Sequence, residues 1–240
     1  MLCFLHQPKT GGSTLNGVLR RNFGPRHVDL ISGDGPWMPI TERDVRLARR
    51  LHPGIRSVAS HRVSVHDGLG DASWRWFTIV REPIARTISE YQFYRSHLGG
   101  DLDIENNIEA KELRNLQVRR IAGTEDIEAA IRTLRERFFF VGHMERFDES
   151  LAALSVLIGE PRFSGAYVRK NNASDHTIAD KMRSDPGIMR YIAGITELDA
   201  ELFAQVRDHV FPELLERAAA QGSLPDVSTM SVPRYAPRLA

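Results

Sequence analysis

A lysine, two glycines and two hydroxyl residues follow a short apolar run in the stretch FLHQPKTGGSTL, residues 4 to 15. The glycines let backbone N–H groups converge without interference from a Cβ atom. Ser13 and Thr14 can add hydroxyl donors beside the cationic Lys9, so the stretch is typical of a phosphate-binding turn. A tight turn without a ligand has the same pattern, and both interpretations predict a strand, a turn and a helix.

The lysine precedes the glycine pair, whereas the Walker A pattern G-x-x-x-x-G-K-[ST] places the lysine after the glycines. The other half of an ATP site is missing as well, since no run of four apolar residues ends in an aspartate that could hold Mg²⁺. The run FTIV ends in Arg81, and the run FFFV ends in Gly142 and His143. These patterns favour an anion-binding loop that needs no metal ion.

Two segments together resemble the cofactor signature of the carbohydrate sulfotransferases related to the heparan sulfate O-sulfotransferases. They are the lysine–glycine stretch and FTIVREPIARTISEY, residues 77 to 91. Shorter likenesses are found in LRNLQVRRIAG, FFFVGHMERFDESLAAL and ELDAELFAQV, so the resemblance covers about residues 2 to 210. Gln7 stands where this family commonly has Ile, and Ser60 precedes His61 where Gly is frequent.

Members of this family use 3′-phosphoadenosine 5′-phosphosulfate (PAPS), and the resemblance implies the residues that hold it. The 5′-phosphosulfate would contact Lys9, Thr10, Gly11, Gly12, Ser13 and Thr14. The 3′-phosphate would contact Arg81 and Ser89, and the helix starting at Pro83 would offer its positive N-terminal end nearby. Arg169 and Asn172 in the loop RKNNASD could close over the same phosphate, with an exposed turn as the alternative.

Sulfuryl transfer needs a general base for the acceptor hydroxyl and a cation beside the leaving phosphate. Lys9 is the candidate cation. The candidate bases are His61 and His66 in ASHRVSVHDGLG, because the family has a histidine near the acceptor in a similar segment, and an imidazole pKa near 6.5 suits proton removal at neutral pH. We favour His61, because it directly follows a predicted strand.

Other residues have weaker indications of a role in binding. Arg86 lies on a predicted helix, where a structural ion pair is commoner than a ligand contact, and His143 is expected to be structural. Trp74 and Trp76 are expected in the core. Trp37, in a loop, is the better candidate for stacking on a sugar ring, with an ordinary surface position as the alternative.

Predicted strands alternate with predicted helices along the chain. The strands are expected at 2–6, 56–60, 73–80 and 138–143, and the helices at 13–23, 41–52, 83–96, 104–122, 124–137, 145–158 and 196–210. Residues 24–40 are expected to be a loop. The charged residues of the stretch TERDVRLARRLH are expected to form the solvated face of an amphipathic helix.

The strands are nearly all apolar, which predicts an α/β fold with a three-layer parallel sheet flanked by helices. The resemblance narrows this to a P-loop NTPase-like sulfotransferase fold. Ligands of parallel sheets bind beyond the carboxyl ends of the strands, so the loops starting at Gln7, His61, Arg81 and His143 should converge. We expect one sulfotransferase domain over residues 1–220 and a flexible tail over 221–240.

The composition is that of a globular protein, with 42% hydrophobic and 26% charged residues. Lysine and arginine number 32 against 31 acidic residues, so no global charge favours nucleic acid as a partner. Cys3 is the only cysteine and is expected to be a buried thiol. With no apolar window of about 18 residues, we expect a cytoplasmic chain without stable membrane insertion.

The sequence therefore predicts a sulfotransferase that moves the sulfuryl group of PAPS to a hydroxyl of a carbohydrate or glycolipid acceptor, with no metal required. Two alternatives are an ATP-dependent P-loop phosphotransferase and a non-catalytic nucleotide-binding module. The sequence does not indicate the acceptor or the oligomeric state.

Overall fold

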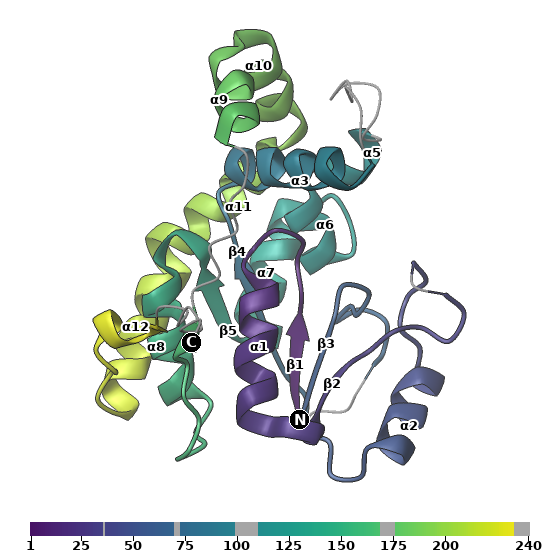
Figure 1. The fold of residues 1–240 in the computed structure, drawn as a ribbon, viewed down its shortest axis with the longest axis vertical. Coiled ribbons are helices and arrows are strands. Elements are labelled where there is room, and N and C mark those ends of the chain that lie inside the picture. Colours follow the sequence, from purple (N-terminus) through teal and green to yellow (C-terminus); the bar gives the residue numbers. More distant parts are fainter. Residues whose placement is uncertain (36, 70–72, 99–109, 169–175, 233–240) are drawn as a thin grey trace, which may run out of the picture.

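A five-stranded, all-parallel sheet forms the centre of the molecule (Figure 1). The computed structural model describes the 240 residues except 36, 70–72, 99–109, 169–175 and 233–240. The sheet has the order β2-β3-β1-β4-β5. Its strands are β1 (Leu2–Leu5), β2 (His27–Asp29), β3 (Ser57–Ser60), β4 (Arg75–Val80) and β5 (Phe138–His143). The predicted parallel sheet is confirmed.

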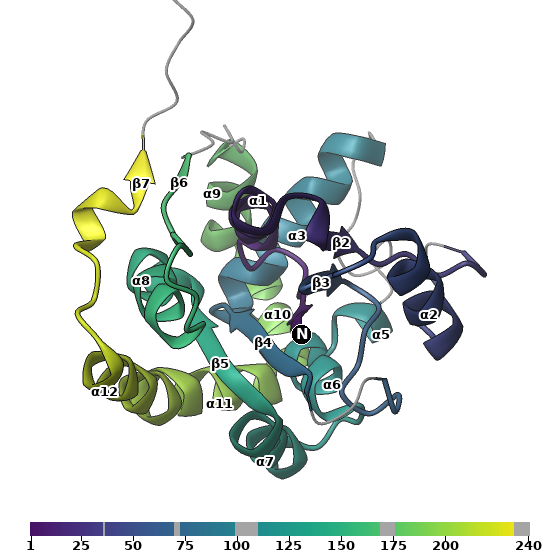
Figure 2. The same cartoon turned by 90° about the horizontal axis from the view of Figure 1, so that it is seen from below.

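Helices cover both faces of the sheet and make the three layers seen in Figures 1 and 2. On one face lie α1 (Gly12–Phe23) and α8 (Phe147–Leu157), and on the other lie α6 (Leu116–Ala122), α7 (Ile127–Arg137) and α11 (Glu197–Gln205). The sheet is buried from both sides, which explains why the central strands β1, β4 and β5 are mostly apolar instead of alternating.

The core between the layers is aromatic and aliphatic. The rings of Phe4 on β1 and Phe77 on β4 stack at 5.1 Å between centroids. Trp74 and Trp76 keep only 5% and 3% of their surface exposed, so their predicted place in the core is confirmed. Cys3 is fully buried, as predicted, and burial raises the pKa of its thiol well above the ordinary value.

A second hydrophobic cluster joins the long helix α3 (Pro83–Leu98) to the helices α9 (His176–Ser184) and α10 (Pro186–Ile195). It includes Ile88 and Tyr91 of α3, and Met182 and Ile192 of the other two helices. Figure 1 shows α9 and α10 rising above the sheet beside α3. The sequence did not predict α9 and α10.

Several predicted boundaries are wrong. Residues 24–40 were expected to be a loop, but they contain a 3-10 turn, Gly24–Arg26, and the edge strand β2. A single helix over 104–122 is contradicted, because α5 (Ala110–Leu113) and α6 are separated at Asn115, which has a φ of 42°. The helix expected from residue 124 begins later, because the side chain of Asp126 caps α7 by accepting from the N–H of Ala129.

The remaining elements complete the chain. The helix α2 (Glu42–Leu51) starts with a capping box between Thr41 and Asp44, and Met144–Arg146 forms a 3-10 turn before α8. After α11, a π-helical turn at Val206–Val210 continues into α12 (Phe211–Gln221), so the helix predicted to end at 210 is longer.

The stretch after α12 packs against the rest of the chain as far as it is described. It contains a 3-10 turn, Val227–Thr229, and the strand β7 (Ser231–Val232), which pairs with β6 (Tyr167–Val168). Met230 is buried. Residues 222–232 therefore differ from the flexible tail expected over 221–240, and residues 233–240 lie outside the described part.

Candidate functional site

The loops after β1, β3, β4 and β5 meet at the carboxyl edge of the sheet, as predicted. His61 Nδ1 lies 2.8 Å from the carbonyl oxygen of His6, and Arg81 Nη1 donates to the carbonyl of Lys9 at 2.8 Å. The chain leaves β1 toward one edge of the sheet and β4 toward the other, so the loops of β1 and β4 flank the point where the strand order reverses. Ligands of open parallel sheets bind at this point.

The turn between β1 and α1 has an unusual backbone. Lys9 has a φ of 63° and Gly11 a φ of 78°, both in the left-handed region. A non-glycine residue reaches this region at an energetic cost, and such residues cluster at functional sites. The hydrogen bond from Arg81 to the Lys9 carbonyl helps to hold the turn.

The first turn of α1 lacks the side-chain cap that α2, α7 and α10 have, and α6, α8, α11 and α12 lack one as well. Gly11 precedes this turn, no side chain accepts its N–H groups, and it contains no acidic residue. The N–H of Thr14 donates to the Gly11 carbonyl at 3.0 Å, so the N–H groups without a partner among the described residues are those of Gly12 and Ser13. The hydroxyls of Ser13 and Thr14 have no hydrogen-bond partner among the described residues, and Ser13 is exposed. Free N–H groups at the positive end of a helix form an anion-binding site, and these two hydroxyls can add donors to it.

Thr10 is placed differently from the expectation. Its side chain is fully buried, and its hydroxyl donates to the carbonyl of Gln7 at 2.9 Å. The hydroxyl therefore stabilises the turn from inside and is not available to a ligand.

Both glycines are required by the space around them. A Cβ atom on Gly12 would lie 1.8 Å from Nε2 of His6, and a Cβ atom on Gly11 would lie 2.7 Å from Sδ of Met144. The ring of His6 is held in place, because it stacks on Phe4 at 5.2 Å and on His61 at 3.8 Å between centroids. The sequence motif contains His6, but its packing against Gly12 was not foreseen.

The ammonium of Lys9 lies over α3. Its Nζ atom is 4.5 Å from the centroid of the Phe93 ring. Burial lowers the pKa of Lys9, the Glu90 carboxyl opposes this shift, and Arg81 adds to it. Neither Phe93 nor Glu90 was predicted as a neighbour of the lysine, since both depend on how α3 crosses the loop.

Arg86 has a structural role, in agreement with the favoured interpretation. Its side chain is fully buried, and Nη1 lies 3.2 Å from Oε2 of Glu90 one turn later. Burial raises the pKa of Glu90, while Arg86 and Lys9 pull it down. The carboxyl of Glu90 thus lies in the field of both cations, and removing Arg86 would leave a buried acid without its ion-pair partner.

The loop after β4 is fixed by a glutamine on α6. Gln117 accepts from the backbone N–H of Arg81 and donates to its carbonyl, both at 2.9 Å. Arg81 is half-buried, and burial lowers the pKa of its guanidinium against the opposing effect of Glu145. Only one of its donor atoms bonds to Lys9, so the other N–H groups can contact an anion.

The N-terminal end of α3 is not free, which contradicts the expectation that it would attract the 3′-phosphate. Glu82 accepts from the N–H groups of Ile84 and Ala85 at 3.0 and 2.6 Å. This carboxylate neutralises the positive end of the helix. Ser89 lies further along α3, half-buried, without a hydrogen-bond partner among the described residues.

His61 is oriented as a base would need to be. Its Nδ1 atom faces a carbonyl oxygen, which can only accept, so Nδ1 carries the proton and Nε2 keeps its lone pair. Burial lowers its pKa, the hydrogen bond to His6 opposes this, and Arg120 and Arg62 lower it further. His61 is exposed, and its lowered pKa favours the neutral ring at pH 7.

His66 lies at the end of α6. Its Nε2 atom is 2.8 Å from the carbonyl of Ile121, and a Cβ atom on Gly123 would lie 3.1 Å from its ring. The hydrogen bond caps a carbonyl of the last helical turn, which is a structural role.

Arg120 is a neighbour of the histidines that sequence analysis missed. Its Nε and Nη2 atoms are buried and have no hydrogen-bond partner among the described residues. Burial lowers its pKa to about 10, with Arg62 acting in the same direction. The pKa of His6 falls to about 3, mainly through burial, with His61 and Arg120 contributing. No feature of the sequence around Arg120 indicates this position, which depends on the packing of α6.

His143 is buried against Phe203 and Phe211, and its Nδ1 atom lies 3.2 Å from Oε2 of Glu145, so its expected structural role is confirmed.

Trp37 is 74% exposed, and the guanidinium of Arg62 lies 5.2 Å above its ring. Arg169 and Asn172 lie outside the described residues.

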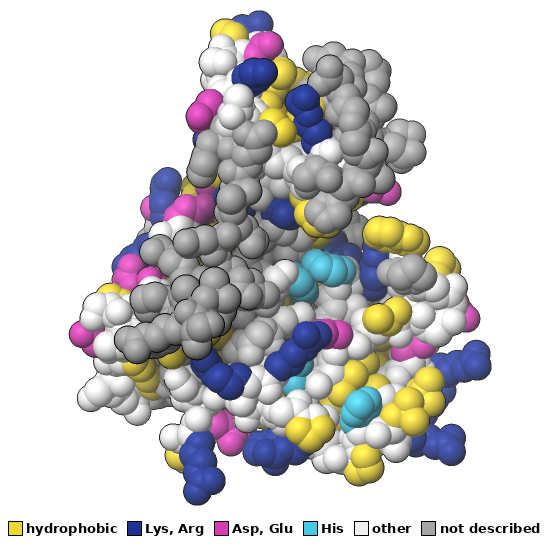
Figure 3. Space-filling model, viewed as in Figure 1, with side chains coloured by type: hydrophobic (Ala, Val, Ile, Leu, Met, Phe, Trp, Pro, Cys, Tyr) yellow, Lys and Arg dark blue, Asp and Glu magenta, His cyan; other side chains and the backbone are white. Residues whose placement is uncertain are grey.

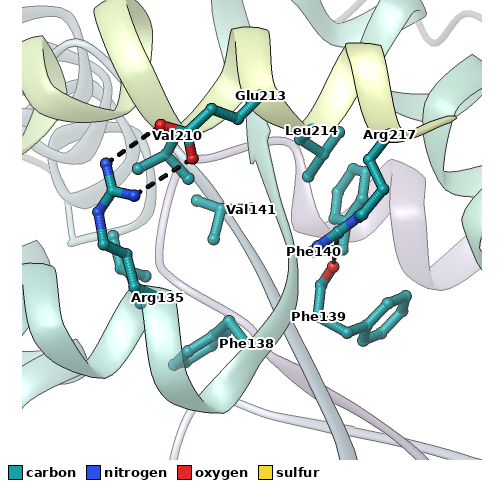
Figure 4. A pocket seen from close by; sticks show the side chains of 10 residues that line it. Arg135, Phe138, Phe139, Phe140, Val141, Val210, Glu213, Leu214 and Arg217 are labelled. Carbon is teal, nitrogen blue, oxygen red and sulfur yellow. Dashed lines mark hydrogen bonds and ion pairs between the residues drawn. The ribbon is translucent and has the colours of Figure 1, made fainter. Parts of the chain in front are cut away.

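A cavity of about 260 Å³ lies elsewhere, between α7, β5 and α12 (Figure 4). Phe138 and Phe140 contribute to its lining, and an ion pair between Arg135 and Glu213 at 3.2 Å borders it. None of the lining residues belongs to the strand-end loops, so we do not include this cavity in the candidate site.

The described residues contain no group of three or more histidine, cysteine, aspartate or glutamate side chains that could hold a metal ion. Among the described helices, none is long and apolar enough to cross a membrane. No family model matches the chain, and no curated protein matches it.

Proposed function

We propose that this protein is a PAPS-dependent sulfotransferase with a P-loop-like sulfotransferase fold, and that it acts on a hydroxyl of a carbohydrate or glycolipid. The observation that carries the proposal is the uncapped first turn of α1, which lies beside Lys9 and Arg81 at the reversal point of a parallel sheet. Backbone N–H groups, a lysine and an arginine together suit a ligand with more than one phosphate or sulfate group.

The residues at the carboxyl edge fit PAPS by several criteria. Gly12 leaves no room for a Cβ atom because the His6 ring fills that space, so the glycine lets the turn before α1 pack closely against β1. The α1 N–H groups, with Ser13 and Thr14, would hold the phosphosulfate, and Arg81 and Ser89 would hold the 3′-phosphate. PAPS, when bound, supplies the sulfuryl group.

The protein's own residues would then divide the work of the reaction. Nε2 of His61 takes the proton of the acceptor hydroxyl, because Nδ1 is already committed to the His6 carbonyl. Lys9 offsets the negative charge that develops on the leaving phosphate, and the α1 N–H groups stabilise the transferring group. His6 is a positioning residue, since its carbonyl selects the tautomer of His61 and its ring packs on it.

Two alternative functions, an ATP-dependent phosphotransferase and a non-catalytic nucleotide-binding module, are tested by ligand binding and by an assay of sulfate transfer. The protein should be stabilised against heat by 3′,5′-adenosine bisphosphate without Mg²⁺ and not by ATP with Mg²⁺; the opposite pattern would support a phosphotransferase. His61→Ala should keep the nucleotide affinity and lose sulfate transfer. If the wild type transfers sulfate to no member of a broad panel of glycans and glycolipids, the protein is a binding module.

Lys9→Ala is the sharpest test of the reaction itself. Turnover should fall about 10²- to 10³-fold, because the lysine acts on charge that appears in the transition state. Affinity for 3′,5′-adenosine bisphosphate, which lacks the sulfate, should change by less than about tenfold, as measured by calorimetry. The control is Lys181→Ala, at an exposed position of α9, which should alter neither value. An equal loss of turnover and of affinity for the product nucleotide would contradict a role of Lys9 in stabilising the transition state.

A further inference from the structure

Exposed hydrophobic side chains are concentrated in one short region. Of nine large hydrophobic side chains exposed among the described residues, five lie between residues 31 and 51. They are Ile31 (70% exposed), Trp37 (74%), Met38 (49%), Leu47 (51%) and Leu51 (66%), which we call the apolar patch. Such a concentration of exposed hydrophobic side chains on one helix and the loop before it indicates an interaction site.

Arginines surround this patch. The helix α2 carries Arg43, Arg46, Arg49 and Arg50, all exposed. Between residues 26 and 62 the chain has seven arginines and four acidic residues, although the whole chain has a net charge of only +1. Arg46 pairs with Glu42 at 2.9 Å, whereas Arg43, Arg49 and Arg50 have no hydrogen bond or ion pair within the described part of the chain.

The packing of α2 turns its leucines outward. Asp44, Val45 and Ala48 form the buried face of the helix, so Leu47 and Leu51, one turn apart, remain at the surface. Arg43 lies one turn before Leu47 on the same line of the helix. The sequence predicted an ordinary solvated face here, but two exposed leucines bordered by arginines are a different surface.

The loop before α2 belongs to the same surface. The backbone N–H of Gly33 donates to Oδ1 of Asp44 at 2.8 Å, which ties the loop to the start of α2. Arg62 holds this loop as well, with its guanidinium over Trp37 and its carbonyl accepting from Ile40 N at 3.1 Å. Figure 3 shows hydrophobic and Lys/Arg side chains side by side over α2 and this loop.

We propose that the apolar patch and its arginines dock the protein reversibly on an anionic lipid bilayer. A bilayer interface accepts all parts of this surface at once, because aliphatic side chains enter the acyl boundary, tryptophan lies at the headgroup level, and arginines meet lipid phosphates. A second copy of the chain would bring two cationic surfaces together. A nucleic acid would match the arginines and Trp37, but it offers nothing to the four aliphatic side chains.

Vesicle flotation of the full chain tests this proposal without any assay of catalysis. The protein should float with vesicles of phosphatidylcholine and phosphatidylserine, bind less as salt is raised, and bind weakly to phosphatidylcholine alone. In Arg43→Gln/Arg50→Gln, binding should fall at least tenfold, because each arginine near an anionic surface contributes about fivefold. Leu47→Ser/Leu51→Ser should cause a loss of about the same size.

Matched variants separate docking from general surface effects. Leu224→Ser/Val227→Ser removes two other exposed hydrophobic side chains, and Arg132→Gln/Arg190→Gln removes two other exposed arginines. Both should float like the wild type, and all variants should keep the wild-type melting temperature. The proposal is overturned if the wild type ignores anionic vesicles or if the patch variants bind them as well as the controls do. It is also overturned if an RNA oligonucleotide is bound in preference, or if the patch variants change only self-association.

Discussion

The helices α1 and α3 both begin at the carboxyl edge of the sheet, after the neighbouring strands β1 and β4, but their first turns differ. The first turn of α1 follows Lys9 and Gly11 and has no cap. The first turn of α3 is closed by the carboxylate of Glu82. No side chain accepts from the first-turn N–H groups of α1, whereas a carboxylate of the chain itself accepts from those of α3.

Under the proposed function, the two helix ends have separate tasks. Leaving a helix uncapped costs about 1 kcal/mol of stability, a cost that proteins accept where a ligand will supply the missing acceptor. The closed end of α3 gives no comparable attraction, but it fixes the backbone beside Arg81, whose guanidinium reaches across to Lys9. We expect the anion to be held by the α1 end, with α3 contributing side chains only.

Closing the space at the α1 end should have the largest effect on stability. Gly12→Ala places a methyl group 1.8 Å from the His6 ring, which cannot move away between Phe4 and His61, so we expect a loss of about 1–3 kcal/mol. Binding of 3′,5′-adenosine bisphosphate should be lost with it. Gly17→Ala, in the same helix with open space around it, should stabilise by about 0.5–1 kcal/mol. Urea unfolding measures both, and similar values for the two variants would contradict the packing argument.

Acid should weaken the α1 end through His6. The pKa of His6 is about 3 in the folded protein and near 6.5 in the unfolded chain. Between these two pH values the unfolded chain binds a proton at this residue and the folded protein does not. The contribution of His6 to the free energy of unfolding is therefore fully present above pH 6.5. It falls as the pH drops toward 3, by up to about 1.4 kcal/mol per pH unit.

The variant His6→Phe keeps a flat ring but cannot titrate. Its unfolding free energy, measured between pH 6.5 and pH 5, should fall less steeply than that of the wild type by the contribution of one proton. His27, whose pKa burial lowers to about 4, should still contribute in both proteins. Parallel curves would show that His6 is not the group responsible.

Removing charge from the α3 end should have the smallest effect. Glu82→Gln keeps an oxygen acceptor but removes the negative charge, and we expect 3′,5′-adenosine bisphosphate to bind about two- to fivefold more tightly. Glu128→Gln, in the first turn of distant α7, should leave the affinity unchanged. Calorimetry measures the affinity of both variants for 3′,5′-adenosine bisphosphate. Weaker binding by Glu82→Gln would contradict the prediction, because it would mean that the carboxylate of Glu82 favours binding of the nucleotide.

Much of this architecture was predictable, because apolar strands and turn glycines are local signals. The parallel sheet, the turn at Gly11 and Gly12 and the convergence of the strand-end loops all follow from the positions of strand ends. The edge strand β2 was missed because its three residues lie in a segment rich in glycine, proline and aspartate. The break at Asn115 was missed because nothing in its local sequence indicates a positive φ.

The site was predictable in its motifs but not in its contacts. The charge pair of Arg86 and Glu90 was within reach of sequence reasoning, since the two residues are four apart on a predicted helix. The burial of Arg120 and the ring of Phe93 beneath Lys9 depend on how helices pack across the loops, which no local pattern encodes. The capping role of Glu82 could have been found from its place directly before Pro83.

The contact between Gly12 and the His6 ring has a consequence for how this chain can vary among relatives. The two positions lie six residues apart but share one volume, so neither can change freely without the other. In an alignment they should behave as a coupled pair, with residues larger than glycine at the second position only where the first has lost its ring. A relative that breaks this coupling would need a different path for the loop.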